Sequence, residues 1–277
     1  RHFDVTNANT EPVFFAYRSH SGVKAVLDEI CLQDPAVHFT SEDGITHTCY
    51  VVDDQLQEGK LLRYFEEMDA LYIADGHHRT ASAAKIGLKR REEHPNYSGD
   101  EAFHFFLAVL FDEDELMIMD YNRVVKDLNG LSEGEFLNRV KEVFTVEKST
   151  QAVRPQQKGT FGMYLGDAWY RLTIKEAFLK DKDLIASLDV SLLQDHLLAP
   201  ILGVEDPRSD ERIDFVGGIR GLEELERRVA HDMSVAFSFY PTSAAELFTV
   251  ADAGEIMPPK STWFEPKLRS GLFVHTL

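Results

Sequence analysis

Apolar residues in the first sixty positions alternate between short continuous runs and amphipathic stretches. The run 13–17 (VFFAY) has the length and composition of a buried β-strand. In 22–32 the apolar residues recur at helical spacing, which predicts an amphipathic helix. The stretch 46–52 (THTCYVV) is rich in β-branched and aromatic residues and predicts a further strand, after which Asp54 can cap a second helix.

The next apolar run, 70–74 (ALYIA), ends directly at Asp75 and Gly76 and predicts another buried strand. The stretch 80–89 that follows is rich in alanine and lysine, residues with high helix propensity. The sequence therefore predicts a strand, a tight glycine turn and a helix in immediate succession.

The middle of the chain has the pattern of two hairpins. Apolar runs at 103–111 and 116–119 flank an acidic segment, 112–115, which we interpret as a solvated turn between two paired strands. Residues 162–174 predict a second hairpin with Gly166 at its tip.

Between the hairpins, Ser132 is followed three residues later by Glu135, the spacing of a capping box, so we predict a helix over 132–144. The last third again mixes element types. Its predicted elements are helices at 189–202, 221–231 and 243–254 and strands at 213–216, 235–240 and 271–275. Because helices and hairpins alternate irregularly, we predict an α+β (mixed α/β) fold. The aperiodic stretch 149–159 marks the expected boundary between a core, 1–148, and a C-terminal α+β part, 149–277, packed against it as one unit.

The chain is acidic, with 47 aspartates and glutamates against 29 lysines and arginines and a formal net charge of −18. Such a surface repels phosphate backbones and anionic lipids, which argues against general nucleic-acid or membrane binding. An anionic ligand would therefore have to be bound by a local cluster of donors.

The two cysteines, Cys31 and Cys49, offer neither a disulfide framework nor metal-ligand spacing. No apolar run approaches the ~18 residues of a membrane span, and no signal-peptide pattern opens the chain. We therefore expect a cytoplasmic protein, for which a homodimer is one option. Since the chain begins at Arg1 rather than at a methionine, we also expect residues upstream.

The predicted strand–turn–helix junction gathers several polar side chains: Asp75, His77, His78, Arg79 and Thr80, around Gly76. Glycine lets a ligand approach the backbone closely. The first N–H groups of a helix have no intrahelical partner and carry partial positive charge, so they attract anions. Arg79 has a guanidinium suited to phosphate, and Asp75 can act as a base. We therefore predict a phosphate or nucleotide site formed by Gly76, His78, Arg79 and Thr80, with Asp75 and His77 as catalytic candidates.

Two simpler interpretations of this junction stay open. In the first, Asp75 caps the helix, Arg79 makes a surface ion pair and the histidines have no role. In the second, the histidines and Asp75 bind a transition metal. Adjacent side chains rarely bind one ion, and Arg79 repels cations, so we predict no protein-bound metal.

The segment YIADGHHRTASA (72–83) resembles the signature of a bacterial and archaeal family of unknown function. Further stretches that resemble this family are 2–17, 190–203, 213–218 and 250–272, so the resemblance covers nearly the whole chain. The family is similar to the free-serine kinases and, more remotely, to the ParB/sulfiredoxin superfamily, in which such a turn binds nucleotide phosphates. The resemblance implies a ParB/sulfiredoxin-like nucleotide-binding core with additional α+β elements.

For individual residues, the resemblance implies that Asp75, His77 and Arg79 match the acid, histidine and arginine of the serine-kinase turn. The acid would help to deprotonate a serine hydroxyl, while the other two and the backbone hold phosphate. The kinases usually have another residue at the position of His78. They also have a glutamate near the N-terminus, for which Glu11 is the only early candidate here. The implied cofactors are Mg²⁺ with ADP or ATP.

A loop at 257–267 interleaves polar residues with prolines and aromatics. Lys260, Ser261 and Thr262 could contact a phosphate, although the loop lacks the glycines of a P-loop; packing of its aromatic residues onto the core is the alternative. We expect these three beside the 75–80 turn, because one turn supplies little positive charge on so acidic a chain. Arg123 is a weaker candidate for the same anion, against an ordinary ion pair.

Three functions are consistent with the sequence. The first is a small-molecule kinase or phosphotransferase that binds a nucleotide at 75–80 and phosphorylates a serine-like, hydroxyl-bearing substrate. The second is a non-catalytic nucleotide-binding regulatory module. The third is a metal-assisted phosphoester hydrolase that uses His77 and His78.

Overall fold

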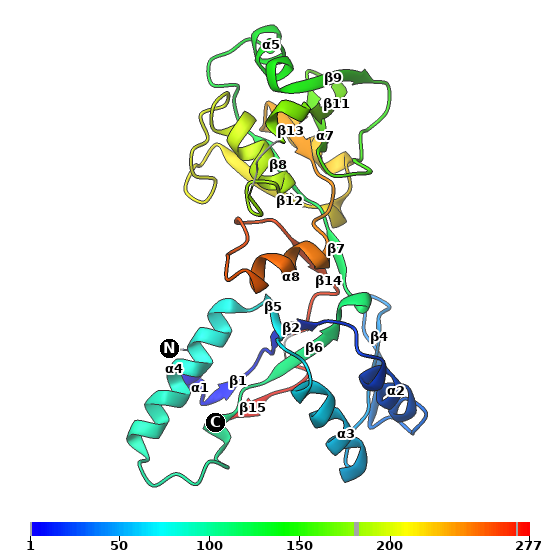
Figure 1. Ribbon diagram of the computed structural model, residues 1–277, viewed down its shortest axis with the longest axis vertical. Helices are drawn as coiled ribbons and strands as arrows, with labels where there is room; N and C mark the ends of the chain where they lie inside the picture. Colours follow the sequence, from blue (N-terminus) through cyan, green and yellow to red (C-terminus); the bar gives the residue numbers. More distant parts are fainter. Residues whose placement is uncertain (1, 180–182, 270) are drawn as a thin grey trace. The chain divides into compact units, whose positions relative to one another are not determined.

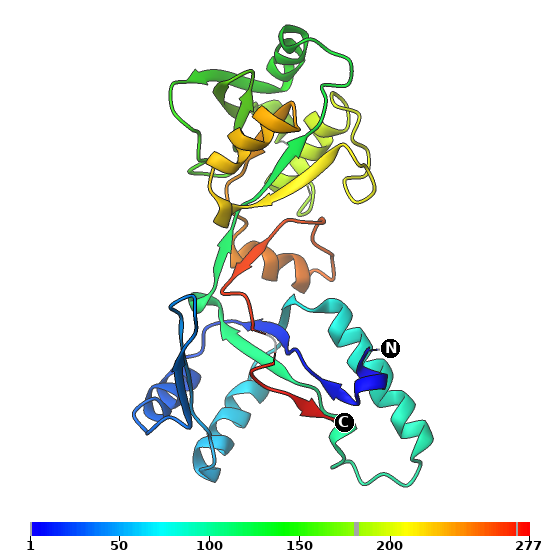
Figure 2. The same cartoon turned by 180° about the vertical axis from the view of Figure 1, so that it is seen from behind.

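The computed structural model describes residues 2–179, 183–269 and 271–277. The chain forms two compact units, Arg1–Leu116 with Lys267–Leu277, and Met117–Pro266. Both units combine helices with β-strands (Figures 1 and 2), so the predicted α+β (mixed α/β) class is confirmed. The division that we expected between 148 and 149 falls within the second unit.

The first unit is built around a three-stranded sheet in the order β5-β2-β6. Its helices are α1 (His2–Thr6), α2 (Ser21–Ile30), α3 (Gln55–Glu66), α4 (His77–Glu93) and two 3₁₀ turns, η1 (Ala102–His104) and η2 (Glu113–Glu115). Its strands are β1 (Ala8–Asn9), β2 (Val13–Tyr17), β3 (Val37–Thr40), β4 (Thr46–Cys49), β5 (Tyr72–Asp75), β6 (Ala108–Asp112) and β15 (His275–Thr276). Two small antiparallel pairs, β1 with β15 and β3 with β4, complete the unit.

The central strand β2 has different partners on its two edges. It runs antiparallel to β5, with Phe14 opposite Asp75, and parallel to β6, with Tyr17 opposite Asp112. As a result, the turn after β5 lies at the start of β2, whereas the carboxyl ends of β2 and β6 lie together at the opposite end. The sheet therefore presents two separate sets of loops.

Among the helices that flank this sheet, α2 buries the most apolar side chains, whereas α4 buries Ile86 and α3 has no fully buried residue. Helix α2 buries Val23, Val26 and Ile30, and it packs beside α3. Figures 1 and 2 show α4 on one side of the three strands and the pair α2–α3 on the other. The side chain of His20 caps α2 by accepting hydrogen bonds from the N–H groups at the start of that helix.

The second unit contains a six-stranded antiparallel sheet in the order β12-β8-β13-β10-β11-β9. Its strands are β7 (Met117–Met119), β8 (Tyr121–Val125), β9 (Phe144–Ser149), β10 (Thr160–Leu165), β11 (Ala168–Ile174), β12 (Ile213–Gly217), β13 (Val235–Ser238) and β14 (Trp263–Glu265). Its helices are α5 (Glu133–Val143), α6 (Asp189–Leu193), η4 (Gln194–Leu198), α7 (Glu223–His231), α8 (Ala244–Asp252) and two 3₁₀ turns, η3 (Glu176–Phe178) and η5 (Gly218–Arg220). Strands β7 and β14 pair separately.

The main hydrophobic core lies in the second unit, where one face of the sheet packs against α5 and the segment after 184. Phe136, Val140, Phe161 and Phe237 are completely buried there. Ser132 and Glu135 form the predicted capping box at the start of α5. The hairpin predicted at 162–174 is confirmed as β10 and β11.

The structure corrects three predicted elements. The runs 103–111 and 116–119 do not form a hairpin, because β6 pairs with β2 and β7 pairs with β14. The helix predicted over 189–202 changes from an α-helix to a π-helix at Gln194. The strand expected at 271–275 is reduced to His275–Thr276 within the described residues.

None of the helices in the described ranges combines the length and the apolar composition needed to cross a membrane.

Candidate functional site

The turn between β5 and α4 has the backbone that the sequence predicts. Gly76 caps the helix with φ +93°, a left-handed conformation that favours glycine. Its carbonyl accepts the N–H of Thr80 at 2.9 Å and the hydroxyl of Thr80 at 3.1 Å. Asp75 accepts the N–H of Gly76 through Oδ1 at 2.7 Å. The turn is thus stabilised by its own polar groups.

The Arg79 guanidinium lies directly over this turn. A Cβ atom at Gly76 would stand 3.0 Å from Nε and Nη2 of Arg79, so glycine provides the space as well as the conformation. Arg79 donates to Glu11 Oε2 at 3.2 Å and lies 3.8 Å from Asp75 Oδ2. Two carboxylates therefore hold the guanidinium in place.

Part of the hydrogen-bonding capacity of Arg79 is unused. Its Nε atom is buried and has no hydrogen-bond partner among the described residues. The first helical hydrogen bond begins at Thr80, and the preceding N–H groups in α4 have no intrahelical acceptor. Buried donors of this kind are normally satisfied, so the turn retains donors that a ligand can use.

A cavity of about 350 Å³ opens beside the guanidinium. It is lined by His2, Phe3, Thr10, Glu11, His78, Arg79 and Ser82. All these residues belong to the first unit. Of the six residues predicted at the turn, His78 and Arg79 line the cavity. Asp75 is not part of the lining, but it contacts Arg79, which is. The side chain of His77 is exposed outside that lining.

Sequence reasoning identified Glu11 only through the resemblance, and it missed Thr10 and Ser82. Glu11 precedes Arg79 by 68 residues and contacts it because β2 pairs with β5. Ser82 is three residues after Arg79 on α4, so helical spacing could have indicated it.

A metal site at the turn has no ligand set in the described part of the chain, where no three histidine, cysteine or acidic residues are grouped so that they could hold an ion. A hydrolase that relies on His77 and His78 as metal ligands gains no support from this geometry.

Arg123 lies in the second unit, on β8, and is 4% exposed. Its guanidinium is stacked near the rings of Phe215 and Phe239, with centroid distances of 5.1 and 4.8 Å, and donates to the carbonyl oxygens of Tyr121 and Pro259. Burial lowers the pKa of Arg123 to about 9. No carboxylate among the described residues forms an ion pair with Arg123. The alternative interpretation of this residue, an ordinary surface ion pair, is therefore wrong for the described part of the chain.

The loop that carries Lys260, Ser261 and Thr262 also lies in the second unit. Lys260 Nζ is 5.5 Å from the centroid of the Tyr121 ring. Ser261 is buried and donates its hydroxyl to the Pro258 carbonyl at 2.5 Å, which is a structural contact. Arg123 contacts this loop through its hydrogen bond to the Pro259 carbonyl. Because Arg79 and Lys260 belong to different units, their expected proximity stays a prediction.

A family model described as "Protein of unknown function (DUF1015)" matches residues 1–191. The chain belongs to this family. No curated protein matches the sequence.

Solved structures similar to this chain include a mutant free serine kinase in complex with ADP. That structure has 16% identity and a TM-score of 0.41, with 95% of this chain and 76% of that chain covered. A conserved hypothetical protein from Pyrococcus furiosus has 13% identity and a TM-score of 0.42, with coverages of 97% and 82%. A free serine kinase in complex with AMP has 15% identity and a TM-score of 0.39, with coverages of 93% and 89%.

Proposed function

We propose that this protein binds a nucleotide through its phosphates at the Gly76 turn and transfers a phosphoryl group to a small serine-like hydroxyl compound. The observation that carries the proposal is the Arg79 guanidinium, held against Gly76 at the edge of a cavity with its buried Nε donor unpaired. The serine-like acceptor rests on the resemblance of the segment 72–83 to the serine-kinase turn.

Phosphate recognition would use donors that the protein leaves unsatisfied. Nε of Arg79 and the first N–H groups of α4 are such donors, and the positive end of the helix dipole lies at the same place. Glu11 and Asp75 orient the guanidinium, so little side-chain entropy is lost on binding. The two carboxylates also make the site acidic, which favours a phosphate that arrives with a counterion.

Asp75 would act as the base. One of its oxygens is engaged by the Gly76 N–H, and the carboxylate is 54% exposed, which leaves acceptor capacity for a substrate hydroxyl. In the proposed step the hydroxyl oxygen forms the new bond to phosphorus, the bond from phosphorus to the nucleotide oxygen breaks, and the hydroxyl proton passes to Asp75.

Two carboxylates are too few for a metal site built by the protein alone, but Mg²⁺ usually binds through one or two carboxylates together with substrate phosphates, and Glu11 and Asp75 would supply such oxygens beside the cavity. When bound, Mg²⁺ would neutralise phosphate charge during the transfer.

Equilibrium binding of ADP and ATP, measured calorimetrically with and without Mg²⁺, tests the nucleotide site. Loss of the charged contact in Arg79→Ala should weaken binding by roughly 10- to 150-fold, the equivalent of about 1.5–3 kcal/mol. Arg63→Ala is the matched control, since Arg63 is an exposed arginine on α3 of the same unit. If both variants lost the same affinity, or if the wild-type protein bound neither nucleotide, the proposed site would be wrong.

Phosphoryl transfer to free serine, followed by the appearance of phosphoserine, tests the activity separately. Asp75→Asn should abolish transfer and keep or improve nucleotide affinity, because the amide cannot take the proton and one negative charge is removed near the phosphates. Wild-type binding without turnover of serine or other small alcohols would favour a regulatory nucleotide-binding module instead.

A further inference from the structure

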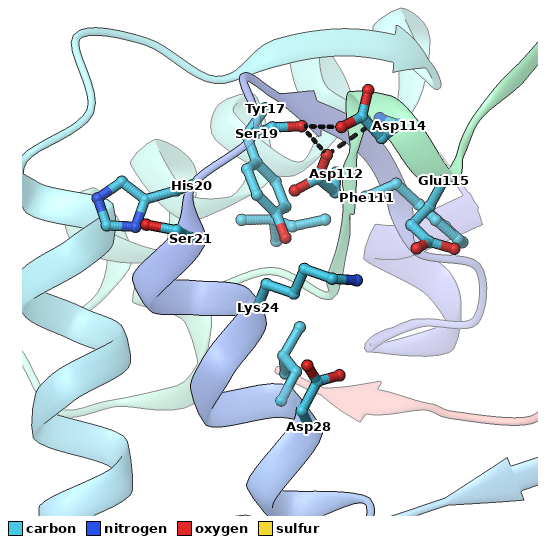
Figure 3. Close-up of a pocket in the computed structure, with 12 residues that line it drawn as sticks. Tyr17, Ser19, His20, Ser21, Lys24, Asp28, Phe111, Asp112, Asp114 and Glu115 are labelled. Carbon is cyan, nitrogen blue, oxygen red and sulfur yellow. Dashed lines mark hydrogen bonds between the residues drawn. The ribbon is translucent and has the colours of Figure 1, made fainter.

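A larger cavity opens at the opposite end of β2 from the Gly76 turn. Its volume is about 640 Å³, and Figure 3 shows it between the first turns of α2 and the end of β6 with the adjoining η2. Polar side chains that line it are Tyr17, Ser19, His20, Ser21, Lys24, Asp28, Asp112, Asp114 and Glu115. The four residue steps along β2 from Val13 to Tyr17, at about 3.3 Å each, separate the two ends of the strand by roughly 13 Å.

Tyr17 contributes a hydroxyl without a hydrogen-bond partner among the described residues to the lining of this cavity. The residue is 3% exposed, and its ring packs edge-on against Phe65 with a centroid distance of 5.2 Å. The hydroxyl points into the cavity in Figure 3 and has no hydrogen bond to any described residue. Burial, with added repulsion from Asp112 and Glu115, raises the pKa of Tyr17 to about 12, so the phenol stays neutral at pH 7.

The walls of the cavity are predominantly negative. Asp112 and Asp114 share the single proton of the Ser19 hydroxyl, which lies within hydrogen-bonding distance of both carboxylates. Asp28 on α2 and Glu115 on η2 make no hydrogen bond or ion pair with the described residues. Four carboxylates thus face a single lysine ammonium, and the cavity attracts cations.

The distribution of the carboxylates selects the kind of cation. In the described part of the chain no three of them are grouped to hold a metal ion. They lie on three different elements, α2, β6 and η2, and the apolar side chains of Leu27, Leu110 and Phe111 also line the cavity. This arrangement matches a molecule with separated positive charges joined by an apolar stem.

We propose that this cavity binds an aliphatic diamine or polyamine, with its ammonium groups near the Asp112–Glu115 segment and Asp28 and with one of them donating to the Tyr17 hydroxyl. This site is separate from the proposed nucleotide site, and its ligand does not depend on that function.

Lys24 places one positive charge in the cavity, and this charge distinguishes the binding of a cation from that of an anion. Its side chain extends across the cavity in Figure 3, and no carboxylate among the described residues lies within 4 Å of its ammonium. A second ammonium must therefore enter against this like charge. Replacing Lys24 by methionine should tighten diamine binding, whereas it should weaken the binding of an anion or a zwitterion.

Isothermal titration of the whole chain with putrescine and with spermidine tests the site. We expect Asp28→Asn and Glu115→Gln each to weaken binding by about two- to fivefold, the usual size for one exposed charge pair. Tyr17→Phe should weaken it by about 2- to 10-fold through loss of one hydrogen bond. Lys24→Met should tighten it by about two- to fivefold.

Two controls separate this site from general attraction and from the nucleotide site. Asp34→Asn removes an equal charge from an exposed position outside the cavity and should leave the affinity unchanged, as should Arg79→Ala. The proposal is overturned if millimolar putrescine and spermidine give no binding, or if Asp34→Asn weakens binding as much as Asp28→Asn does. It is also overturned if Mg²⁺ displaces the diamine at equal concentration, or if Lys24→Met weakens binding.

Discussion

Asp189, the first residue of α6, is a buried carboxylate whose ionisation should reduce the stability of the second unit. Its side chain is 8% exposed. Oδ1 accepts the N–H of Gly159 at 2.8 Å, but Oδ2 is buried without a partner among the described residues. Burial is the largest cause that raises the pKa of Asp189 from 3.8 to about 6.

The difference between a pKa of 3.8 in the unfolded chain and about 6 in the folded protein sets the sign and the size of the effect of Asp189 on stability. A carboxyl group with a raised pKa holds its proton more tightly in the folded protein. Its contribution to stability is therefore fully present below pH 3.8 and is lost as the pH rises through 6. At about 1.36 kcal/mol for each pKa unit, ionised Asp189 lowers the free energy of unfolding by roughly 3 kcal/mol at pH 7.

Asp189→Asn removes this pH dependence while keeping an oxygen that can accept the Gly159 N–H. The new amide group adds a constant cost of about 1–3 kcal/mol if it finds no acceptor, so the slope is more informative than the value at one pH. We expect the free energy of unfolding of the variant, relative to the wild type, to rise by roughly 3 kcal/mol between pH 4 and pH 7.

Urea unfolding followed by tryptophan fluorescence measures this slope, because both tryptophans, Trp169 and Trp263, lie in the second unit with Asp189. Glu135→Gln is the control in the same unit. Hydrogen bonds from Ser132 lower the pKa of Glu135, so its contribution is present at neutral pH and is lost as the pH falls, the opposite trend. A difference between Asp189→Asn and the wild type that stays constant from pH 4 to pH 7 would refute the reasoning.

Two further predictions concern local structure. Gly76→Ala should lower the free energy of unfolding by roughly 1–3 kcal/mol, measured by circular dichroism in urea, because φ is positive and the new Cβ would crowd Arg79. Gly99 also has positive φ but has open space around it, so Gly99→Ala should lower the free energy of unfolding by less. An equal loss in both variants would exclude crowding of Arg79 as a cause of the Gly76→Ala effect. Ser132→Ala should lower the free energy of unfolding by about 1 kcal/mol, because the capping box at the start of α5 is lost. Urea unfolding followed by tryptophan fluorescence measures this loss, and an unchanged urea midpoint would contradict the role of the cap.

Features that depend on neighbouring residues could be predicted from the sequence. The capping box at Ser132, the buried strand 13–17 and the strand–turn–helix at Gly76 all formed where the pattern indicated. Each is governed by backbone propensity, by a hydrogen bond within four residues or by a local run of apolar side chains. The family relationship is likewise a property of the sequence, since it rests on matched residues.

Features that depend on the choice of distant partners were decided by the tertiary structure. An apolar strand such as β6 can pair with any exposed edge, and burial against β2 determined its partner instead of the nearer β7. The same pairing of β2 with β5 brings Glu11 to Arg79, and the parallel ends of β2 and β6 enclose Tyr17 among acidic side chains. No local pattern encodes these contacts, because their free energy comes from groups that become neighbours only when the sheet assembles.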